Sequence, residues 1–286
     1  MFCSRSLFKL SVLFLLAALL SACSQNNNDS RAVHYETNEE MREALATWQV
    51  ECSGADCNPS VGQLVTVTGA KSVELCTGFL AEDANTFVTN DHCLEMYRSG
   101  EVCTGRSYIY FRQNGQTLRV NCLNIAMRTH KATNEKNLTN GFENYPDIGV
   151  LKIDGASLQR PASLHQKVTD QELGLSVDQV HPAASQLYGY VVDPSESGEA
   201  VGYMRRVACE VTPNTTPLGL EVKTKAAVLL QNCYLKKGNS GSPLFNESGR
   251  VAAVVFGMNN YKSLLATNLS CLKNIRSNPE ASICMQ

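Results

Sequence analysis

The chain has 286 residues, of which 43% are hydrophobic and 18% are charged, and its formal net charge is -2. This composition is that of a globular protein with at least one full core, and it excludes a disordered or fibrous chain. Basic residues form no cluster longer than the pairs Arg205-Arg206 and Lys236-Lys237, so we expect no nucleic-acid partner.

The first 22 residues have the features of a secretory signal. Arg5 and Lys9 give a positive start, and the apolar run 10–20 is shorter than the ~20 residues that a membrane-spanning helix needs. The run ends in LSAC, residues 20–23, which resembles the lipobox of bacterial lipoproteins. In those proteins the chain is cut before the cysteine and a lipid is attached to it. The resemblance implies a signal peptide over 1–22 and a lipidated Cys23.

A lipid on Cys23 would hold the exported chain at the bacterial cell envelope, because two or more acyl chains suffice for stable anchoring. By the usual rule of that family, Ser24 in place of an aspartate favours the outer membrane. Residues 24–30 (SQNNNDS) contain no apolar side chain and predict a flexible tether. The alternative is an ordinary signal cut near Ala22, which would release a soluble secreted protein.

A short amphipathic helix is predicted after the tether. Met41, Leu45 and Trp48 recur at helical spacing, and Thr37 and Glu40 have the spacing of a capping box. We expect this helix to pack against the main domain rather than to bind a partner.

From Val61 onward the sequence consists of short apolar or alternating runs that are separated by turn residues. Many short strands at this spacing, with no helical period between them, favour an antiparallel barrel or sandwich, so the expected fold class is all-β. The runs are QLVTVTG, CTGFLAED, NTFVTND, SYIYFRQNG, IGVLKIDG, QLYGYVVD, AAVLLQN and VAAVVFG.

The cysteine count agrees with export. Of 12 cysteines, Cys3 leaves with the signal and Cys23 would be lipidated, and the even remainder in an exported chain indicates up to five disulfides. The connectivity stays open; pairs of sequence neighbours are Cys52-Cys57, Cys103-Cys122, Cys209-Cys233 and Cys271-Cys284. A metal site near Cys52 and His34 is the alternative, but no further ligand spacing supports it, and we expect no metal.

A candidate nucleophile, Ser240, lies in the stretch GNSGSP (residues 238–243). Gly241 follows it directly, and Asn239 separates it from Gly238. To attack a carbonyl, a serine hydroxyl needs a base, a group that orients the base, and hydrogen-bond donors where negative charge develops. Glycine allows backbone amides to converge without a Cβ in the way. Alone, the stretch is compatible with a plain turn between two strands.

Two further motifs precede this serine. CTGFL followed by FVTNDHC puts His92 at the end of an apolar strand, beside Cys93, and DIGVLKI puts Asp147 at the head of another. In this order the three motifs resemble the chymotrypsin-like (trypsin-fold, PA clan) serine peptidases. The branch most similar is the bacterial glutamyl-endopeptidase-like group, which shares GNSGSP and a cysteine at the place of Cys233. The resemblance also implies a disulfide between Cys93 and Cys76.

The resemblance assigns chemical roles to individual residues. Ser240 is the implied nucleophile, and His92 is the general base that later acts as general acid. Asp147 would hold the imidazole in the right tautomer, and the amides of Gly238 and Ser240 would form the oxyanion hole. This acyl transfer needs no cofactor or metal.

The implied fold is a pair of antiparallel six-stranded β-barrels at about 61–166 and 186–269, within a peptidase domain 61–286 and after the lipidated tether and short helix of 23–60. The site would lie in the cleft between the barrels.

One departure from the family pattern concerns zymogen activation, because animal digestive members carry an aspartate where this chain has Asn239. A neutral amide cannot pair with a newly cut amino terminus, although a regulatory role for residues 39–57 stays open.

Two further departures from the family pattern do not touch the chemistry directly, and the residues of the specificity pocket do not define which side chain it selects. Asn90-Asp91 replaces the small residues usual before the histidine, and Gly149 replaces an alanine. The pocket would be formed by Tyr234, Leu235, Val255, Phe256 and Gly257. No carboxylate stands at its base to select Arg or Lys, and Val255 stands where the glutamate-selecting branch has a histidine. Lys236 or Lys237 could supply a positive group for an acidic substrate side chain, but two adjacent lysines on a loop are more often simply exposed to solvent.

Two functions of different class follow. The first is a lipid-anchored serine endopeptidase that hydrolyses protein or peptide substrates through an acyl-enzyme on Ser240. The alternative is a non-catalytic binding lipoprotein on a peptidase fold. The four residues His92, Asp147, Ser240 and Gly238 favour catalysis, because a fold kept only for binding has no chemical need for all of them.

Overall fold

The computed structural model of the chain describes residues 31–81, 83–129, 147–158, 186–212, 227–247, 249–258 and 264–268. The expected signal, lipidation site, tether and Cys271-Cys284 pair lie outside these ranges. The described part is mostly β, with one short α-helix, as the sequence pattern predicts. No helix within these ranges is both long and apolar enough to cross a membrane.

Helix α2 (Asn38–Thr47) forms where the apolar periodicity predicts it. Thr37 caps it: its hydroxyl accepts a hydrogen bond from the Glu40 amide (3.1 Å), and the Glu40 carboxylate accepts one from the Thr37 amide (3.2 Å). The predicted capping box is therefore confirmed. Met41 and Leu45 on the inner face are buried, so the helix packs against the main body.

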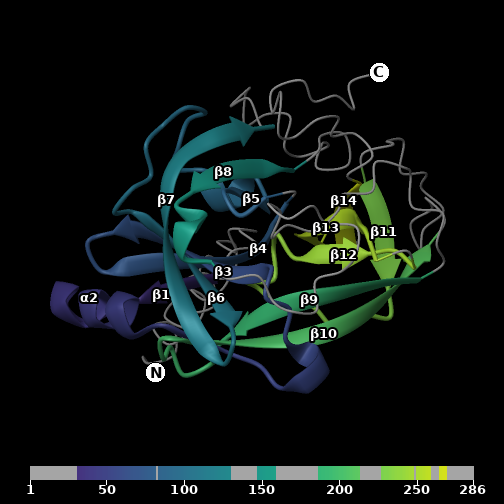
Figure 1. Ribbon diagram of the computed structural model, residues 1–286, viewed down its shortest axis with the longest axis horizontal. Helices are drawn as coiled ribbons and strands as arrows, with labels where there is room; N and C mark the ends of the chain where they lie inside the picture. Colours follow the sequence, from purple (N-terminus) through teal and green to yellow (C-terminus); the bar gives the residue numbers. More distant parts are fainter. Residues whose placement is uncertain are drawn as a thin grey trace, which may run out of the picture.

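The first sheet has the strand order β1-β4-β3-β6-β7-β8-β5, and all its neighbours are antiparallel. Because β4 also pairs with β5, six strands close into a barrel and β1 is added outside β4. The strands are β1 (Arg31–His34), β3 (Val61–Gly69), β4 (Ser72–Leu80), β5 (Thr86–Thr89), β6 (Ser107–Gln113), β7 (Gln116–Arg128) and β8 (Gly149–Ile153). In Figure 1 the barrel strands run from blue to teal.

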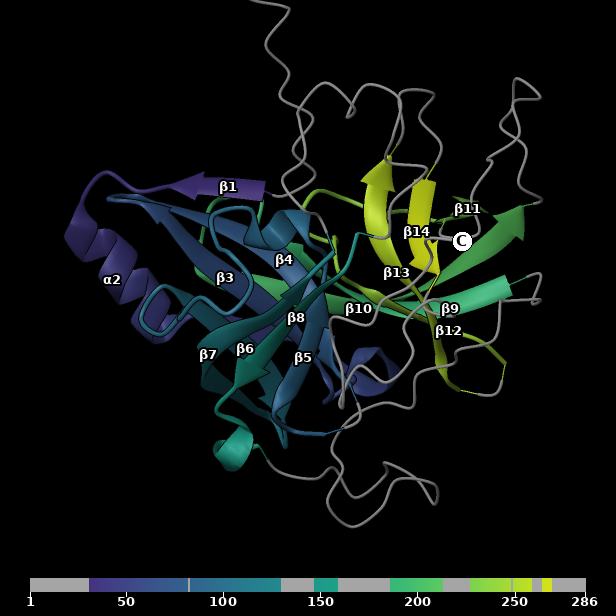
Figure 2. The same ribbon diagram turned by 90° about the horizontal axis from the view of Figure 1, so that it is seen from above.

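The second sheet has the order β11-β14-β13-β12-β9-β10-β2, and β11 also pairs with β10. Its strands are β2 (Gln49–Glu51), β9 (Gln186–Pro194), β10 (Val201–Thr212), β11 (Ala227–Gln231), β12 (Pro243–Phe245), β13 (Val251–Met258) and β14 (Leu264–Asn268). Figure 2 shows β11 to β14 on the side of the molecule away from α2. In the part of the chain that the structure describes, strands are connected by the 3₁₀ turns η1 (Gly54–Asp56), η2 (His92–Leu94) and η4 (Gly155–Ser157).

The segment between α2 and β3 ties the two sheets together. Strand β2 pairs in parallel with β10 of the second sheet. The Val50 amide also donates to the Thr117 hydroxyl of β7 (3.0 Å), and the Trp48 indole donates to buried Gln63 of β3 (2.8 Å). Residues 39–57 thus supply a strand to the second sheet and hydrogen bonds to the first, and releasing them as a regulatory segment would break all of these contacts.

The buried apolar side chains of the described ranges form three cores. One fills the first barrel and includes Leu64, Phe87 and Ile109. Another lies within the second sheet around Leu187 and Leu244. The third joins side chains from the N-terminal segment and both sheets, so burial of apolar surface holds the two halves against each other.

Among the described residues, four disulfides link cysteines that follow one another in the sequence. Each bridge closes a loop of the folded chain, which restricts the unfolded state. The pairs are Cys52-Cys57, Cys76-Cys93, Cys103-Cys122 and Cys209-Cys233.

Candidate active site

Strand pairing brings His92 and Asp147 to the same edge of the first barrel. β5 and β8 are antiparallel, with Thr89 opposite Gly149. His92 comes three residues after Thr89, at the start of turn η2, and Asp147 comes two residues before Gly149. The end of one strand and the start of its partner therefore place the two side chains together, although 55 residues separate them in sequence.

Asp147 uses both carboxylate oxygens on this histidine. Its Oδ2 lies 2.6 Å from His92 Nδ1, and its Oδ1 accepts a hydrogen bond from the His92 amide at 3.0 Å. The two side chains are only 13% and 9% exposed. With an ionised carboxylate at Nδ1, that nitrogen carries the proton in neutral imidazole, so Nε2 is the atom that can accept one.

The electrostatics keep the aspartate ionised. Burial by itself would raise the pKa of the Asp147 carboxyl. The charge of His92, the hydrogen bond from its ring and the bonds from the backbone amides of His92 and Asp91 together outweigh burial, and the pKa of Asp147 lies below its ordinary value. An ionised carboxylate in this place stabilises an imidazolium.

Three residues that the sequence analysis did not assign hold this pair in place. The Asn90 side chain donates to the Asp147 carbonyl oxygen (2.7 Å). Asp91 is 2% exposed and receives two hydrogen bonds from the Arg128 guanidinium, at 2.8 and 3.0 Å. Arg128 also donates to the carbonyl oxygens of Glu95 and Tyr97. An asparagine and an aspartate at the end of an otherwise apolar strand were the available signal in the sequence.

Gly149 has a steric explanation. A Cβ on this residue would lie 2.5 Å from Leu94 Cδ1 and 3.0 Å from the Asn90 carbonyl oxygen. Because Asn90 and Leu94 flank the histidine turn, a larger residue would push that turn away from β8. The glycine therefore allows the close approach of the two elements that hold His92 and Asp147.

The serine lies in the loop between β11 and β12. Ser240 is 3% exposed, and both Gly238 and Gly241 have positive φ, at 96° and 90°. L-residues rarely adopt such φ values, so the two glycines make this loop conformation accessible. The Asn239 amide donates to Lys236 O within the loop (3.1 Å), and the Gly241 amide donates to Val255 O of β13 (2.8 Å), so the loop is held both by its own backbone and by the second sheet.

Thr77 of β4 connects the serine loop to the first barrel. Its amide donates to Ser240 O (2.7 Å), and its hydroxyl donates to Gly238 O (2.9 Å). A Cβ on Gly241 would collide with the Thr77 carbonyl oxygen and with the hydroxyl of Thr89. The loop therefore packs directly on Thr77 within β4 and on Thr89, the last residue of β5, which comes three residues before His92.

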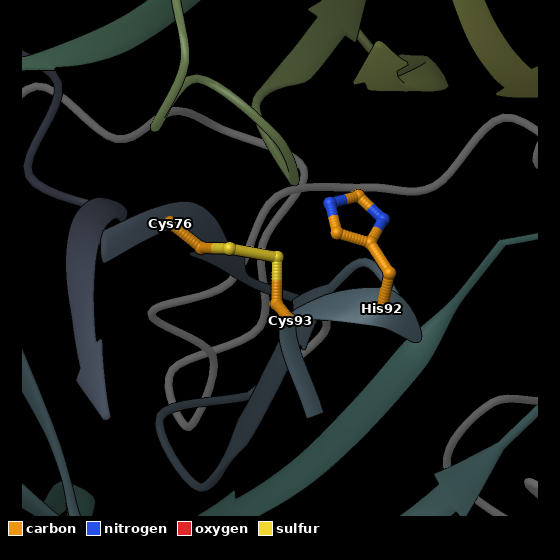
Figure 3. Close-up of side chains that lie close together, drawn as sticks. All are labelled: Cys76, His92 and Cys93. Carbon is orange, nitrogen blue, oxygen red and sulfur yellow. A yellow bond between two sulfur atoms is a disulfide. The ribbon is translucent and has the colours of Figure 1, made fainter. Parts of the chain in front are cut away.

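The disulfide next to Thr77 reaches the histidine itself. Cys76 is bonded to Cys93, and Figure 3 shows the His92 ring beside this bridge. A ring nitrogen and the two sulfur atoms lie within 4.8 Å of one another, the only such group of three candidate metal ligands among the described residues. Sulfurs joined to each other are not thiolates, so this group does not suit a metal. It braces the histidine turn against β4.

The residues expected around the specificity pocket are found in different settings. Tyr234 is 68% exposed, whereas Val255 and Phe256 are 2% and 3% exposed. Leu235 is partly buried and packs against the core of the second sheet, and Gly257 lies in β13. Lys236 forms an ion pair with Glu196 (3.1 Å), which raises the pKa of the lysine. The role of these residues in specificity stays a prediction.

A mostly β fold with one closed barrel, a second sheet, and a histidine-aspartate pair beside a serine loop defines the trypsin-like class of peptidase folds. Residues 76–254 match the family described as trypsin-like peptidase domain. The chain therefore belongs to that family.

Comparison with solved structures shows the fold. A Glu endopeptidase is 16% identical with a TM-score of 0.50, covering 76% of this chain and 89% of the other. An inactivated protease paralogue of the scabies mite, S-D1, is 13% identical with a TM-score of 0.50, covering 74% and 88%. A search of curated proteins found no match.

Proposed function

We propose that the protein is a serine endopeptidase that hydrolyses peptide bonds through an acyl-enzyme on Ser240. The observation that carries this proposal is the doubly bonded His92–Asp147 pair in a barrel whose strand β4 also holds the Ser240 loop. An ionised carboxylate on Nδ1 prepares Nε2 to take the serine proton. Structural histidines do not need this arrangement.

In the proposed reaction, Ser240 Oγ attacks the substrate carbonyl carbon while His92 Nε2 takes the hydroxyl proton. The carbonyl π electrons move to its oxygen, where the amides of Gly238 and Ser240 stabilise the negative charge. Collapse expels the leaving amine, which takes the proton from His92. Water then attacks the acyl-enzyme with His92 as base, releases the acid product and restores Ser240.

The anchoring and the finer fold assignment belong to the same proposal. The sequence LSAC at 20–23 supports a signal peptide and a lipid on Cys23, and with Ser24 it supports an outer-membrane location. The pairing of β10 with both β9 and β11 supports a second six-stranded barrel. Protein or peptide substrates follow from the peptidase assignment, with no cofactor required.

The second candidate is a non-catalytic binding lipoprotein. It has a specific basis, because one structurally similar protein is an inactivated protease paralogue. Against it, His92, Asp147, Ser240 and Gly238 are all present here. The two candidates differ in one property, the reactivity of Ser240 toward an electrophile.

Covalent labelling of the purified, oxidised protein with a fluorophosphonate probe tests the proposal. We expect wild type to be labelled and Ser240→Ala and His92→Ala to be unlabelled, with thermal unfolding showing that both variants are folded. Ser72→Ala and His34→Ala are matched controls in β4 and β1 and should label normally. Absence of labelling in folded wild type would favour the binding protein.

A further inference from the structure

The residue before the proposed nucleophile is completely buried and fully hydrogen bonded. Asn239 is 0% exposed. Its amide nitrogen donates to Asp193 Oδ1 (3.0 Å) and to Val192 O (3.1 Å), and its amide oxygen accepts from the Lys236 backbone amide (2.7 Å). Both N–H bonds and the carbonyl are thus used, with the orientation of the side-chain amide assigned by these partners.

The aspartate that binds this asparagine is itself part of an ion pair. Asp193, near the end of β9, accepts two hydrogen bonds from the Arg205 guanidinium of β10, at 2.7 and 3.2 Å. Their side chains are 13% and 28% exposed, and a bidentate pair at such a place is geometrically specific. Arg205 also donates to Tyr234 O (2.9 Å), at the entry of the same loop. Arg205 and Asp193 therefore contact the loop both at its entry and at the residue before the serine.

The charge distribution explains why an amide stands at this position. An aspartate in place of Asn239 would put a second carboxylate 3.0 Å from Asp193 in a buried place, where like charges repel strongly. A carboxamide instead donates to Asp193. The bonds to Asp193, Val192 and Lys236 fix Asn239, which lies in the chain between Gly238 and Ser240, whose amides are the proposed oxyanion donors.

We propose that Asp193 and Arg205 are positioning residues that hold the Ser240 loop in its reactive arrangement through Asn239. This inference rests on the proposed peptidase function and deepens it. The loop is ordered by residues of β9 and β10 within the domain, so its arrangement does not depend on a newly cut amino terminus. The effect concerns the rate of the covalent step rather than reversible binding, because none of the three side chains lies on the reacting atoms.

The test compares the kinetics of fluorophosphonate labelling, separated into the rate constant of inactivation (kinact) and the binding constant (KI). Asn239→Asp should lower kinact by about 100-fold, the range measured when an oxyanion donor is lost, and leave KI within about threefold. Arg205→Gln should lower kinact in the same direction. Arg206→Gln, the neighbouring arginine that lies over the Tyr188 ring, is the matched control and should label as wild type.

Rescue separates positioning from simple damage to the fold. The double variant Asp193→Asn, Asn239→Asp exchanges the carboxylate and the amide and restores one donor–acceptor pair. Its kinact should be at least tenfold higher than that of Asn239→Asp alone. Hydrogen exchange of residues 236–242 should rise in Asn239→Asp and fall again in the double variant.

Two results would overturn the inference. One is wild-type kinact in both Arg205→Gln and Asn239→Asp; this leaves the peptidase proposal intact. The other is a loss of kinact that is proportional to the loss of thermal stability across the variants and that the double variant Asp193→Asn, Asn239→Asp does not restore. An unlabelled wild type overturns the proposed function together with this inference.

Discussion

Asp147 accepts hydrogen bonds from both the ring and the backbone amide of His92, one on each carboxylate oxygen, at 2.6 and 3.0 Å. The backbone bond fixes where the carboxylate lies, and the ring bond fixes which nitrogen carries the proton. A single residue thus sets both the orientation and the tautomer of the proposed base.

Replacing this aspartate by its amide tests that double role. We expect Asp147→Asn to lower the labelling rate of Ser240 by about 10⁴-fold, because the amide nitrogen can turn toward the ring and favour the wrong tautomer. Labelling kinetics and thermal unfolding of the variant check this. A rate within tenfold of wild type would contradict the assigned role.

The same carboxylate predicts how stability changes in acid. Its pKa in the folded protein lies below the ordinary 3.8, so folding favours the ionised form. The resulting stabilisation is fully present above the ordinary pKa and is lost as pH falls through the folded-state value. The difference in free energy of unfolding between wild type and Asp147→Asn, measured in urea from pH 7 to pH 3, should therefore shrink in acid. A difference that is constant or grows would refute it.

The buried ion pair behind the histidine turn predicts a large change in stability. Arg128→Met would leave the 2%-exposed Asp91 carboxylate without its guanidinium, which should cost about 3–5 kcal/mol in free energy of unfolding. The double variant Asp91→Asn, Arg128→Met removes both charges and should lose less. Urea unfolding distinguishes the two. Equal losses would show that packing of the Arg128 side chain, rather than charge, is what the turn requires.

Two glycines with positive φ provide a matched comparison. Gly241→Ala should disrupt the serine loop and abolish labelling, since the added Cβ meets Thr77 and Thr89. Gly249→Ala has φ of 75° and no atom within 4 Å of the added Cβ, so it should cost only about 1–2 kcal/mol and label normally. Labelling of both variants at the wild-type rate would show that the loop tolerates displacement.

Truncation tests the N-terminal segment. A protein that begins at residue 31 should label as the longer chain does. Removal of residues up to 57 deletes Trp48, Val50 and the Cys52-Cys57 loop, and we expect it to abolish cooperative unfolding. Thermal scans with labelling measure both. A shorter protein that is folded and more reactive would support a regulatory segment instead.

Much of the local structure was predictable from the sequence alone. The cap formed by Thr37 and Glu40, the helix after it and the strands from Val61 follow from patterns that span only a few residues. Such patterns depend on backbone hydrogen bonding and on which face is apolar, and both act locally. The His92, Asp147 and Ser240 motifs were identified in the same way, from short stretches with a resemblance to a family.

The tertiary structure decided which distant residues support those motifs. Asn90, Asp91 and Gly149 looked like departures from a family pattern, and their roles depend on the pairing of β5 with β8 and on Arg128 from β7. For Asn239, the sequence showed only that a neutral amide cannot form an ion pair with a newly cut amino terminus. Its partner Asp193 lies 46 residues earlier in the chain, and Arg205, which pairs with Asp193, is brought to it only when β9 and β10 pair. Side-chain hydrogen bonds of this kind depend on distances of about 3 Å between strands, which local sequence preferences do not determine.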